Sequence, residues 1–327
     1  MATHSFIHIT GTGSYLPGKV LTNHDLEKMV DTTDEWITSR TGIKERHVAA
    51  KEEAASDLAG HAARRALENA NLKPDAVDLI IVATATPDMF FPSTACFVQK
   101  MLGIKEAVSF DVSAACSGFV YALETAKALM QNGSYKVALV IGAEKLSGIT
   151  NWEDRNTCVL FGDGAGAAVL QKRQVPGGIL STYLRSDAAY ADLLNVPGGG
   201  SRLASSSAVK KPNTIHMQGK EVFKLAVQKM ISAAEQALKL AGKKDQDLAL
   251  LIPHQANLRI IEAIAQRVNI PRDRVFVNVD KYGNMSAATT IVALDEARRQ
   301  GRVRKGDLVE LIAFGAGMTW GAAVVQF

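Results

Sequence analysis

The chain has 327 residues, of which 47% are hydrophobic and 21% charged, a composition typical of globular proteins and not of disordered ones. Its net charge of +4, from 37 basic and 33 acidic residues, is too small to indicate a dedicated nucleic-acid-binding protein. No apolar run approaches the roughly 20 residues of a membrane span, so we expect no membrane segment.

The cysteines and the first residues indicate the cellular compartment of the protein. The three cysteines are Cys96, Cys116 and Cys158. They form no CxxC pair and are odd in number, which argues against a disulfide framework or a cysteine-rich zinc site. The opening residues MATHSFIHITGTGSYLPG do not combine a basic segment with a long apolar one, so we expect no signal peptide. These features predict a cytoplasmic protein without a metal site.

Strand and helix patterns alternate along the chain. In the first half the expected strands span 6–17, 76–87, 107–114, 136–144 and 165–171, and the expected helices span 32–42, 56–70, 93–103 and 117–131. In the second half the expected strands span 177–186, 247–254, 306–314 and 318–327, and the expected helices span 219–240, 257–268 and 286–299, with VFVN (275–278) and a glycine turn before the last helix. Nearly continuous apolar strands between helices predict α/β layers with sheets buried on both faces. Both halves also repeat an order of strand, unusual loop and helix, which favours a structural duplication.

Two stretches rich in glycine receive different interpretations. Pro197–Thr214 is rich in Gly and Ser, and we expect a surface loop there. Gly162–Ala167, GDGAGA, resembles a nucleotide-binding loop, but another strand-like run follows it. A dinucleotide fingerprint requires a helix at that point. We therefore expect close backbone packing at GDGAGA and no NAD binding.

Cys116 stands where an extended segment turns into a helix. Free N–H groups and the positive end of the helix dipole favour a thiolate there, which predicts a thiol pKa below the usual value of about 8.5. Its neighbours are small, so a substrate has room to approach the sulfur. On this stretch alone a buried structural cysteine is the commoner arrangement. Cys96, inside a helical pattern, and Cys158, inside an apolar run, fit that arrangement better.

Three further loops carry polar or glycine residues at the ends of expected strands. His254 follows a buried strand, at the sheet edge where α/β proteins place ligands. Asn284 lies just before a helix, where ordinary capping also explains an Asn. Phe314–Gly321, FGAGMTWG, joins two strands, and its N–H groups suit either an oxyanion or a tight bend. Each of these signals is weak alone.

Three of these motifs together are specific. SAACSGF, IPHQANLRI and YGNMSAATT, in this order and spacing, closely resemble the active-site signatures of the β-ketoacyl-acyl-carrier-protein synthase III family, the initiating condensing enzymes of type II fatty-acid synthesis. The resemblance extends over essentially the whole chain. It implies the thiolase fold, with two similar halves, 1–174 and 175–327, stacked as five αβαβα layers. It also implies a homodimer.

The resemblance assigns catalytic roles. Cys116 would take the acyl group from an acyl-CoA starter, acetyl-CoA in our expectation, as a thioester. His254 and Asn284 would donate hydrogen bonds to the malonyl thioester oxygen as the enolate forms, and fixed donors there are worth about 100-fold or more in rate. The backbone N–H groups of Cys116 and Ala316 would form the oxyanion hole. Family members often have three successive glycines here, so Ala316 is a departure, and its donor survives only if its φ is negative.

The resemblance also implies binding surfaces. The residues expected to bind CoA are Thr32, Trp36, Arg40, Arg155, Gly219, Phe223, Ala256 and Asn257, with adenine stacked between Trp36 and Arg155. The residues expected to bind the acidic carrier protein are Gln255, Ala256, Asn257, Leu258 and Arg259. Lys220, Lys224, Arg267, Arg272 and Arg274 either extend this basic rim or form a solvated charged face. Phe91 would reach across the dimer and close the acyl pocket.

The expected partners are therefore acyl-CoA, malonyl-acyl-carrier protein and a second copy of the chain, with no nucleic acid, no membrane and no cofactor, because acyl-CoA is a substrate. Other readings remain open at this point. One is a related condensing enzyme or acyltransferase of secondary metabolism that uses another starter or acceptor. The others are a Cys-His thioester hydrolase, against which Asn284 argues, and a non-catalytic acyl-binding protein.

Overall fold

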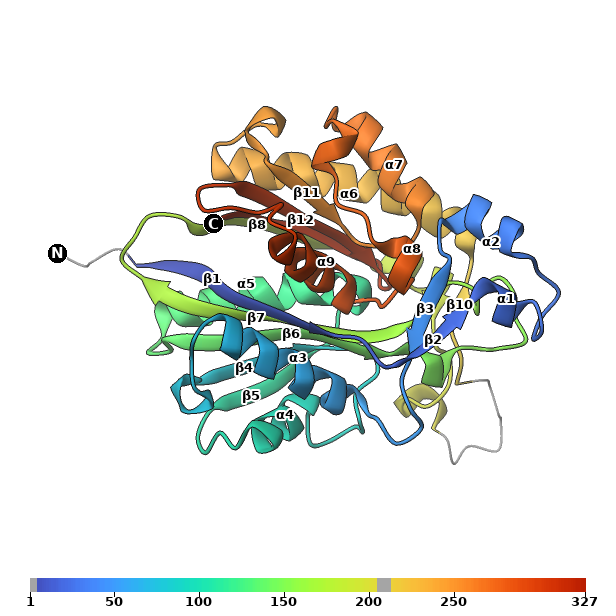
Figure 1. Cartoon of the computed structure of the whole chain (residues 1–327), viewed down its shortest axis with the longest axis horizontal. Helices are drawn as coiled ribbons and strands as arrows, with labels where there is room; N and C mark the ends of the chain where they lie inside the picture. Colours follow the sequence, from blue (N-terminus) through green and yellow to red (C-terminus); the bar gives the residue numbers. More distant parts are fainter. Residues whose placement is uncertain (1–4, 205–212) are drawn as a thin grey trace.

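A computed structural model describes residues 5–204 and 213–327, which form helices and strands in layers (Figure 1). The strands are β1 (Phe6–Tyr15), β2 (Lys19–Thr22), β3 (Glu45–Val48), β4 (Leu79–Ala83), β5 (Val108–Val112), β6 (Val137–Lys145), β7 (Asp163–Arg173), β8 (Gly178–Ser186), β9 (Leu194–Asn195), β10 (His216–Met217), β11 (Leu250–Pro253), β12 (Leu308–Gly315) and β13 (Thr319–Gln326). The α-helices are α1 (Asn23–Leu26), α2 (Asp34–Thr41), α3 (Ala55–Asn69), α4 (Thr94–Leu102), α5 (Gly118–Asn132), α6 (Gly219–Ala241), α7 (Leu258–Arg267), α8 (Val279–Tyr282) and α9 (Ala288–Arg299).

The two main sheets repeat one topology. The first has the order β1-β7-β6-β4-β5, with antiparallel β1-β7 and β7-β6 pairs and parallel β6-β4 and β4-β5 pairs. The second, read as β8-β13-β12-β11, has the same directions in the same order. Val275, in the VFVN segment, adds a single parallel bridge to Leu251 of β11, where the first sheet has β5. The expected duplication is therefore visible in strand order and direction.

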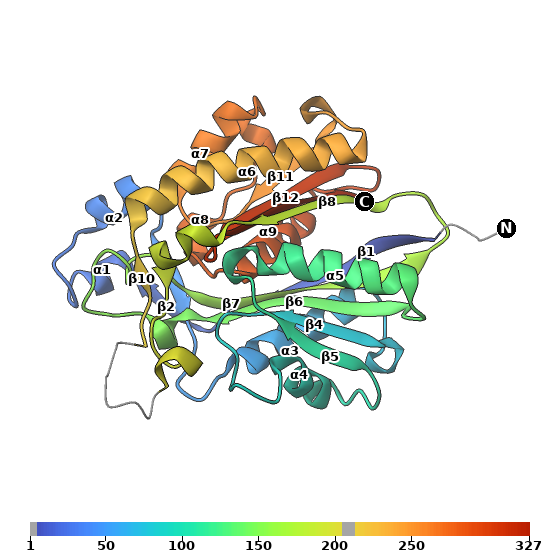
Figure 2. The same cartoon turned by 180° about the vertical axis from the view of Figure 1, so that it is seen from behind.

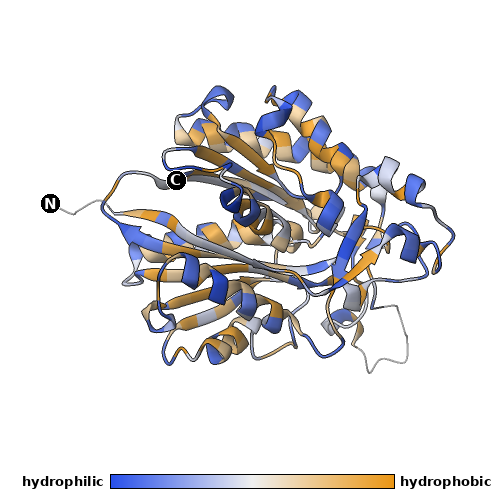
Figure 3. Cartoon of the chain, in the orientation of Figure 1, coloured by the Kyte–Doolittle hydropathy of each residue, from blue (hydrophilic) through white to orange (hydrophobic). Residues whose placement is uncertain are grey.

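The helices complete five layers (Figures 1 and 2). α3 and α4 cover the outer face of the first sheet, α5 and α9 fill the space between the sheets, and α6 and α7 cover the outer face of the second. The central core mixes both halves, since Phe119 of α5 and Ile291 of α9 belong to one buried cluster with Leu311 of β12. Figure 3 shows the apolar residues concentrated on the strands and on the helix faces between the layers. The boundary between residues 174 and 175 stays a prediction.

The structure confirms some of the local predictions and contradicts others. The long elements are confirmed, and all of GDGAGA except Gly162 forms the start of strand β7, not a loop before a helix. A Cβ on Gly164 would lie 2.6 Å from the Met285 sulfur, which confirms close packing there. The sequence missed the short β2-β3 and β9-β10 pairs and helix α8, where a turn was expected. Cys96 was expected to be buried but is exposed on α4, whereas Cys158 is buried as expected.

Two further expectations concerned a surface loop at Pro197–Thr214 and the absence of a membrane segment. Residues 205–212 of the expected Pro197–Thr214 surface loop lie outside the described residues, and the described part contains a short 3-10 turn, Ser201–Leu203. Among residues 5–204 and 213–327, no helix has the length and apolarity that crossing a membrane requires.

Candidate active site

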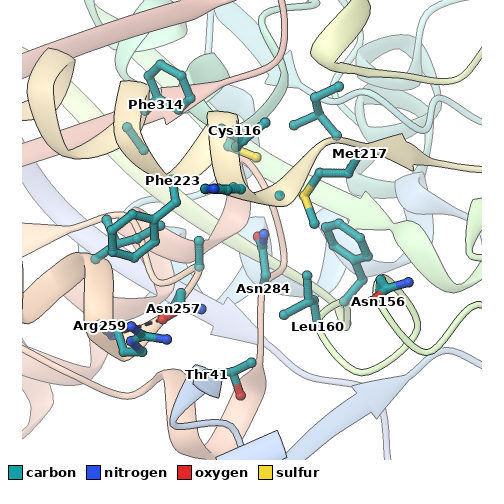
Figure 4. A pocket seen from close by; sticks show the side chains of 18 of the residues that line it. Thr41, Cys116, Asn156, Leu160, Met217, Phe223, Asn257, Arg259, Asn284 and Phe314 are labelled. Atoms are coloured by element: carbon teal, nitrogen blue, oxygen red, sulfur yellow. Dashed lines mark hydrogen bonds between the residues drawn. The ribbon is translucent and has the colours of Figure 1, made fainter. Parts of the chain in front are cut away.

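One cavity of about 840 Å³ brings together the three residues that the motifs predicted (Figure 4). Cys116 comes from the start of α5, His254 from the end of β11, and Asn284 from the loop before α9. Residues far apart in the sequence therefore meet because both central helices begin at the same side of the molecule. Phe314 and Gly315 of β12 line the cavity as well.

Cys116 lies in a 3-10 turn (Ala115–Ser117) that leads directly into α5, as expected, and its side chain is only 8% exposed. Ala115 before it has a φ of 46°, in the left-handed region that few non-glycine residues adopt. Gly315 packs against the turn so closely that a Cβ there would lie 2.6 Å from the Cys116 nitrogen. Burial raises the pKa of the Cys116 thiol to about 12, so the expected lowered pKa is wrong: desolvation outweighs the helix start.

His254 follows β11 and is buried. Its Nδ1 lies 2.5 Å from the Thr289 hydroxyl, which is also 3.0 Å from the Ser286 carbonyl. Nε2 has no hydrogen-bond partner among the described residues. Burial lowers the pKa of His254 to about 3, so the ring is neutral near pH 7. The Thr289 hydroxyl has one hydrogen for two acceptors: when it donates to the Ser286 carbonyl it accepts from Nδ1–H, and when it donates to Nδ1 the ring hydrogen lies on Nε2, which is the form that can donate to a ligand.

Asn284 is held by backbone bonds on both sides. Its N–H donates to the Leu160 carbonyl at 2.8 Å, and its carbonyl accepts from Gly162 N at 3.0 Å. Its side-chain Oδ1 accepts from Ser286 N at 2.8 Å. This hydrogen bond fixes the orientation of the side-chain amide. The Nδ2 hydrogens can then donate to the oxygen of a ligand.

The two expected oxyanion donors come from the Cys116 turn and from the connection between β12 and β13, which packs against that turn. Ala316 follows Gly315, which contacts the Cys116 backbone. Ala316 is not among the described non-glycine residues with positive φ, so the alanine causes no left-handed strain there. Met318 after it is buried and anchored by paired backbone hydrogen bonds with Asp187.

The expected nucleotide contacts form a stack at the cavity's outer end. The Arg40 and Arg155 guanidinium carbons lie 4.7 Å and 5.1 Å from the Trp36 ring centroid. Arg155 also donates to the Asp31 carbonyl at 2.8 Å. Trp36 and Arg155 are in direct contact, so this arrangement leaves no space between them for the adenine that was expected there. Trp36 and Arg40 line the cavity, whereas Thr32 and Arg155 do not.

The remaining channel residues line the cavity as expected. They are Gly219, Phe223, Ala256 and Asn257. Asn257 caps α7 by accepting from Arg259 N at 2.9 Å, and its Nδ2 donates to the Arg40 carbonyl at 3.1 Å. Arg259 is exposed, and its guanidinium lies 5.9 Å from the Phe223 ring. Lys220 and Lys224 border the same opening.

Three predicted residues lie elsewhere. Gln255 is buried, with its amide nitrogen on the Pro253 carbonyl at 2.7 Å and its oxygen accepting from Asn278 N at 3.0 Å, so it supports the loop and offers no docking surface. Leu258 packs against Gly42 outside this cavity. Phe91 is 84% exposed and does not line its own chain's cavity.

Sequence reasoning missed several residues around the site. Thr289 and Ser286 support His254 and Asn284, and Glu144 lies buried behind Cys116. The hydroxyls follow Asn284 in NMSAATT, which is a usable signal, but nothing local marks Glu144 in a strand. Met217 and Asn156 also line the cavity in Figure 4.

A buried cysteine, a histidine and an asparagine facing one cavity between two duplicated α/β halves define a condensing enzyme of the thiolase fold. The model of the 3-oxoacyl-[acyl-carrier-protein] synthase III family matches residues 110–188, and its C-terminal model matches residues 238–327. The chain belongs to the β-ketoacyl-acyl-carrier-protein synthase III family and is an acyl-transferring enzyme of fatty-acid biosynthesis.

Individual relatives agree with this assignment. The β-ketoacyl-[acyl-carrier-protein] synthase III of Caldanaerobacter subterraneus is 56% identical over 321 residues, covering 98% of this chain and 97% of the relative. The crystal structure of 3-oxoacyl-[acyl-carrier-protein] synthase III from Aquifex aeolicus is 50% identical, with a TM-score of 0.92 over 98% of this chain and 100% of that one. A priming β-ketosynthase of a polyketide pathway has the same TM-score but 35% identity, covering 98% of this chain and 96% of that one. The secondary-metabolism alternative is therefore not favoured.

Proposed function

We propose that the enzyme joins an acyl-CoA starter, acetyl-CoA in the first instance, to malonyl-acyl-carrier protein and yields 3-oxoacyl-acyl-carrier protein, CO₂ and CoA. The observation that carries this proposal is the shared cavity of Cys116, His254 and Asn284. We propose that the reaction uses no cofactor, since acyl-CoA is a substrate, and that it takes place in the cytoplasm.

In the first half-reaction the Cys116 sulfur attacks the acyl-CoA carbonyl. Negative charge develops on the carbonyl oxygen, and the N–H groups of Cys116 and Ala316 stabilise it. Collapse breaks the bond to the CoA sulfur and leaves acyl-Cys116. The small residues around Cys116 leave this approach open.

In the second half-reaction the malonyl thioester oxygen lies between His254 Nε2 and Asn284 Nδ2. Loss of CO₂ places an enolate charge on that oxygen, and both groups are neutral donors there. Neutral donors in a dry cavity stabilise a developing charge without reorganising. The enolate carbon attacks acyl-Cys116, and the bond to the Cys116 sulfur breaks.

Substrate entry uses the outer end of the cavity. Trp36 and Arg155 must separate for adenine to stack between them, and Arg40 meets phosphate. Arg259, Lys220 and Lys224 present positive charge at the opening, which suits the acidic carrier protein. Thr32 and Arg155 act from beside the channel.

We propose that the chain forms a homodimer through the free edge of the first sheet. β5 pairs only with β4 among the described strands, which leaves one edge open. Nearby, Phe90 and Phe91 are 83% and 84% exposed, and Met89 and Val108 are also exposed. Such an apolar group beside an open edge suits a partner chain. Phe91 would then enter the partner's acyl pocket, where its bulk favours a short starter.

Intact-protein mass spectrometry tests the proposed reaction. The enzyme is mixed with a set of acyl-CoAs, and malonyl-carrier protein is then added. We expect an acyl mass increment on Cys116 that disappears as 3-oxoacyl-carrier protein forms. An increment released only as free acid contradicts condensation, and no increment with any acyl-CoA contradicts the role of Cys116.

A further inference from the structure

Two hydroxyl groups, those of Ser117 and Thr319, join the two halves of the chain at the Cys116 turn, and the reaction above does not use them. Their oxygens lie 2.6 Å apart, although 202 positions separate the two residues in the sequence. Ser117 is fully buried, and Thr319, at the start of β13, is half-buried. Neither side chain lines the cavity, so we expect neither to touch a substrate.

The Ala114 carbonyl is an acceptor that the two hydroxyls share. It lies 2.9 Å from the Ser117 hydroxyl and 3.0 Å from the Thr319 hydroxyl. It also accepts from Ser117 N at 3.2 Å, which closes the 3-10 turn that contains Cys116. The turn that carries the sulfur is therefore held from within by Ser117 and from the other half of the chain by Thr319.

The Thr319 hydroxyl also contacts the segment that carries the second expected oxyanion donor. It lies 3.0 Å from the Ala316 carbonyl, in the connection between β12 and β13. Just before Ala316, Gly315 packs on the Cys116 backbone, where a Cβ would lie 2.6 Å from the Cys116 nitrogen. One side chain, that of Thr319, thus contacts the backbone of both segments from which the oxyanion donors come.

The two hydroxyls have two hydrogens for these contacts. An oxygen–oxygen distance of 2.6 Å is typical of a hydrogen bond, so one hydrogen lies between Ser117 and Thr319. When Ser117 donates to Thr319, the Thr319 hydrogen goes to the Ala114 or the Ala316 carbonyl. When Thr319 donates to Ser117, the Ser117 hydrogen goes to the Ala114 carbonyl. In either direction Thr319 is bonded to the Cys116 turn.

The other bonds that anchor the β12-β13 connection stay within the second half of the chain. Gly315 and Thr319 face each other in the β12-β13 pair, and Met318 exchanges two backbone hydrogen bonds with Asp187. Across residues 5–204 and 213–327, the hydrogen bonds from this connection to the Cys116 turn are those of the Thr319 hydroxyl. These bonds therefore fix the connection relative to the turn.

We propose that Thr319, assisted by Ser117, is a positioning residue that holds the N–H groups of Cys116 and Ala316 at the separation needed to bind one oxyanion. This inference rests on the proposed function, since acyl transfer to Cys116 is what places an oxyanion there. The acyl carbonyl oxygen gains charge as the sulfur attacks, and two donors stabilise it fully only when both point at that oxygen. Because the donors belong to different halves, a bond between the halves sets their separation.

The test compares two reactions of Cys116 in the full-length enzyme, each followed on the Cys116 peptide by mass spectrometry. Acetylation by acetyl-CoA forms an oxyanion, whereas alkylation by iodoacetamide displaces iodide and forms none. Thr319→Val keeps the branched shape and removes the hydroxyl, so acetylation should slow about 10-fold while alkylation stays within about 3-fold. Thr319→Ser keeps the hydroxyl and should retain most of the acetylation rate. The matched control is Thr125→Val, which removes a hydroxyl bonded to the Tyr121 carbonyl within α5 and should change neither rate.

Ser117→Ala provides a second measurement and guards against misfolding of Thr319→Val. In Ser117→Ala the Thr319 hydroxyl still reaches the Ala114 carbonyl, so acetylation should slow only about 3-fold, with alkylation unchanged. Wild-type acetylation in either variant, equal losses in both reactions, or a larger loss in Ser117→Ala than in Thr319→Val overturns the positioning role. A wild type that is acetylated but never condenses refutes the proposed function and leaves the positioning role standing.

Discussion

The starts of α5 and α9 occupy equivalent places in the two halves but present different chemistry. Each follows a segment at the edge of its sheet, and each includes a non-glycine residue with positive φ, Ala115 at 46° and Ser286 at 45°. The start of α5 presents the Cys116 sulfur, and the start of α9 presents the Asn284 amide and the Ser286 hydroxyl. A duplicated framework thus brings the proposed nucleophile from one half and the proposed donors from the other into one cavity.

The equivalent strands β6 and β12 differ in the same way. Both carry a fully buried carboxyl, Glu144 and Glu310. Glu144 accepts hydrogen bonds from several donors, whereas neither oxygen of Glu310 has a partner within residues 5–204 and 213–327. Burial raises the pKa of Glu310 well above its ordinary value. Equal burial therefore goes with different hydrogen bonding, because several donors surround Glu144 and none in the described part of the chain reaches Glu310.

Removing the nucleophile should give the largest effect. Cys116→Ala should lower condensation by about 10⁴-fold or more, because no other group can form the acyl intermediate. The rate of 3-oxoacyl product formation measures this loss, and circular dichroism checks the fold. Product formation within 10-fold of the wild type would contradict covalent catalysis at the start of α5.

Removing a donor from the other half should separate the half-reactions. Asn284→Ala should lower condensation by about 100-fold or more while acylation of Cys116 stays within 10-fold, because the amide faces only the malonyl oxygen. Single-turnover acylation, followed by mass, and steady-state condensation give the two rates. Equal losses in both would mean that Asn284 supports Cys116 and not the enolate.

Thr289→Val tests whether the Thr289 hydroxyl decides which ring nitrogen of His254 carries the hydrogen. The substitution keeps the shape of the side chain and removes the hydroxyl that lies 2.5 Å from Nδ1. Without that donor the ring hydrogen is no longer held on Nε2, so condensation should fall about 10-fold, with a smaller effect on KM. Thr289→Ser is the matched control and should restore most of the rate. A serine variant as slow as the valine variant would indicate a packing role.

Arg259→Ala should weaken the capture of the carrier protein. The exposed guanidinium at the cavity mouth should contribute about 1 kcal/mol, so KM for malonyl-carrier protein should rise about 5-fold with kcat little changed. The wild-type KM should also rise steeply with added salt, and the variant's less so. Lys100→Ala, which removes an exposed cation of α4 outside the cavity lining, serves as the control. A wild-type KM for malonyl-carrier protein that does not change with salt would contradict electrostatic capture.

Glu310→Gln should have the smallest effect, on stability alone. Because the folded-state pKa of Glu310 exceeds its ordinary value of 4.5, the contribution of Glu310 to stability is fully present below pH 4.5 and is lost as the pH rises toward the folded-state pKa. The glutamine variant lacks this loss, so its advantage in free energy of unfolding should grow between pH 5 and 8, to about 1–2 kcal/mol. Urea unfolding at both values measures it. An advantage that shrinks with pH would show that Glu310 is stabilised as an anion.

The sequence predicted the layers from local signals, and it predicted the three side chains that share the cavity because three motifs together resemble one family. Long apolar strands alternate with amphipathic helices, and Cys116, His254 and Asn284 each stand where a strand or loop leads into a helix. The β2-β3 and β9-β10 pairs were missed because strands of two to four residues carry no usable period and form through pairing.

The pKa of Cys116 and the position of Glu144 could not be predicted from the sequence, for a different reason. Local reasoning placed the sulfur at a helix start, which favours a thiolate. It had no means of knowing that β12 would cover the turn or that a carboxyl from β6 would lie behind it. Burial and charge at this sulfur come from segments distant in the chain, so only the folded structure reveals them.

The contact between Gly315 and the Cys116 turn also has a consequence for the order of biosynthesis. Thr319, at the start of β13, donates to the Ala114 carbonyl at 3.0 Å, so the last two strands clamp the nucleophile's turn. Cys116 emerges from the ribosome long before these strands do. Until they dock, the nascent chain holds Cys116 without the Ala316 N–H that we propose as its second oxyanion donor. The proposed acylation site is thus complete only when the last two strands have docked.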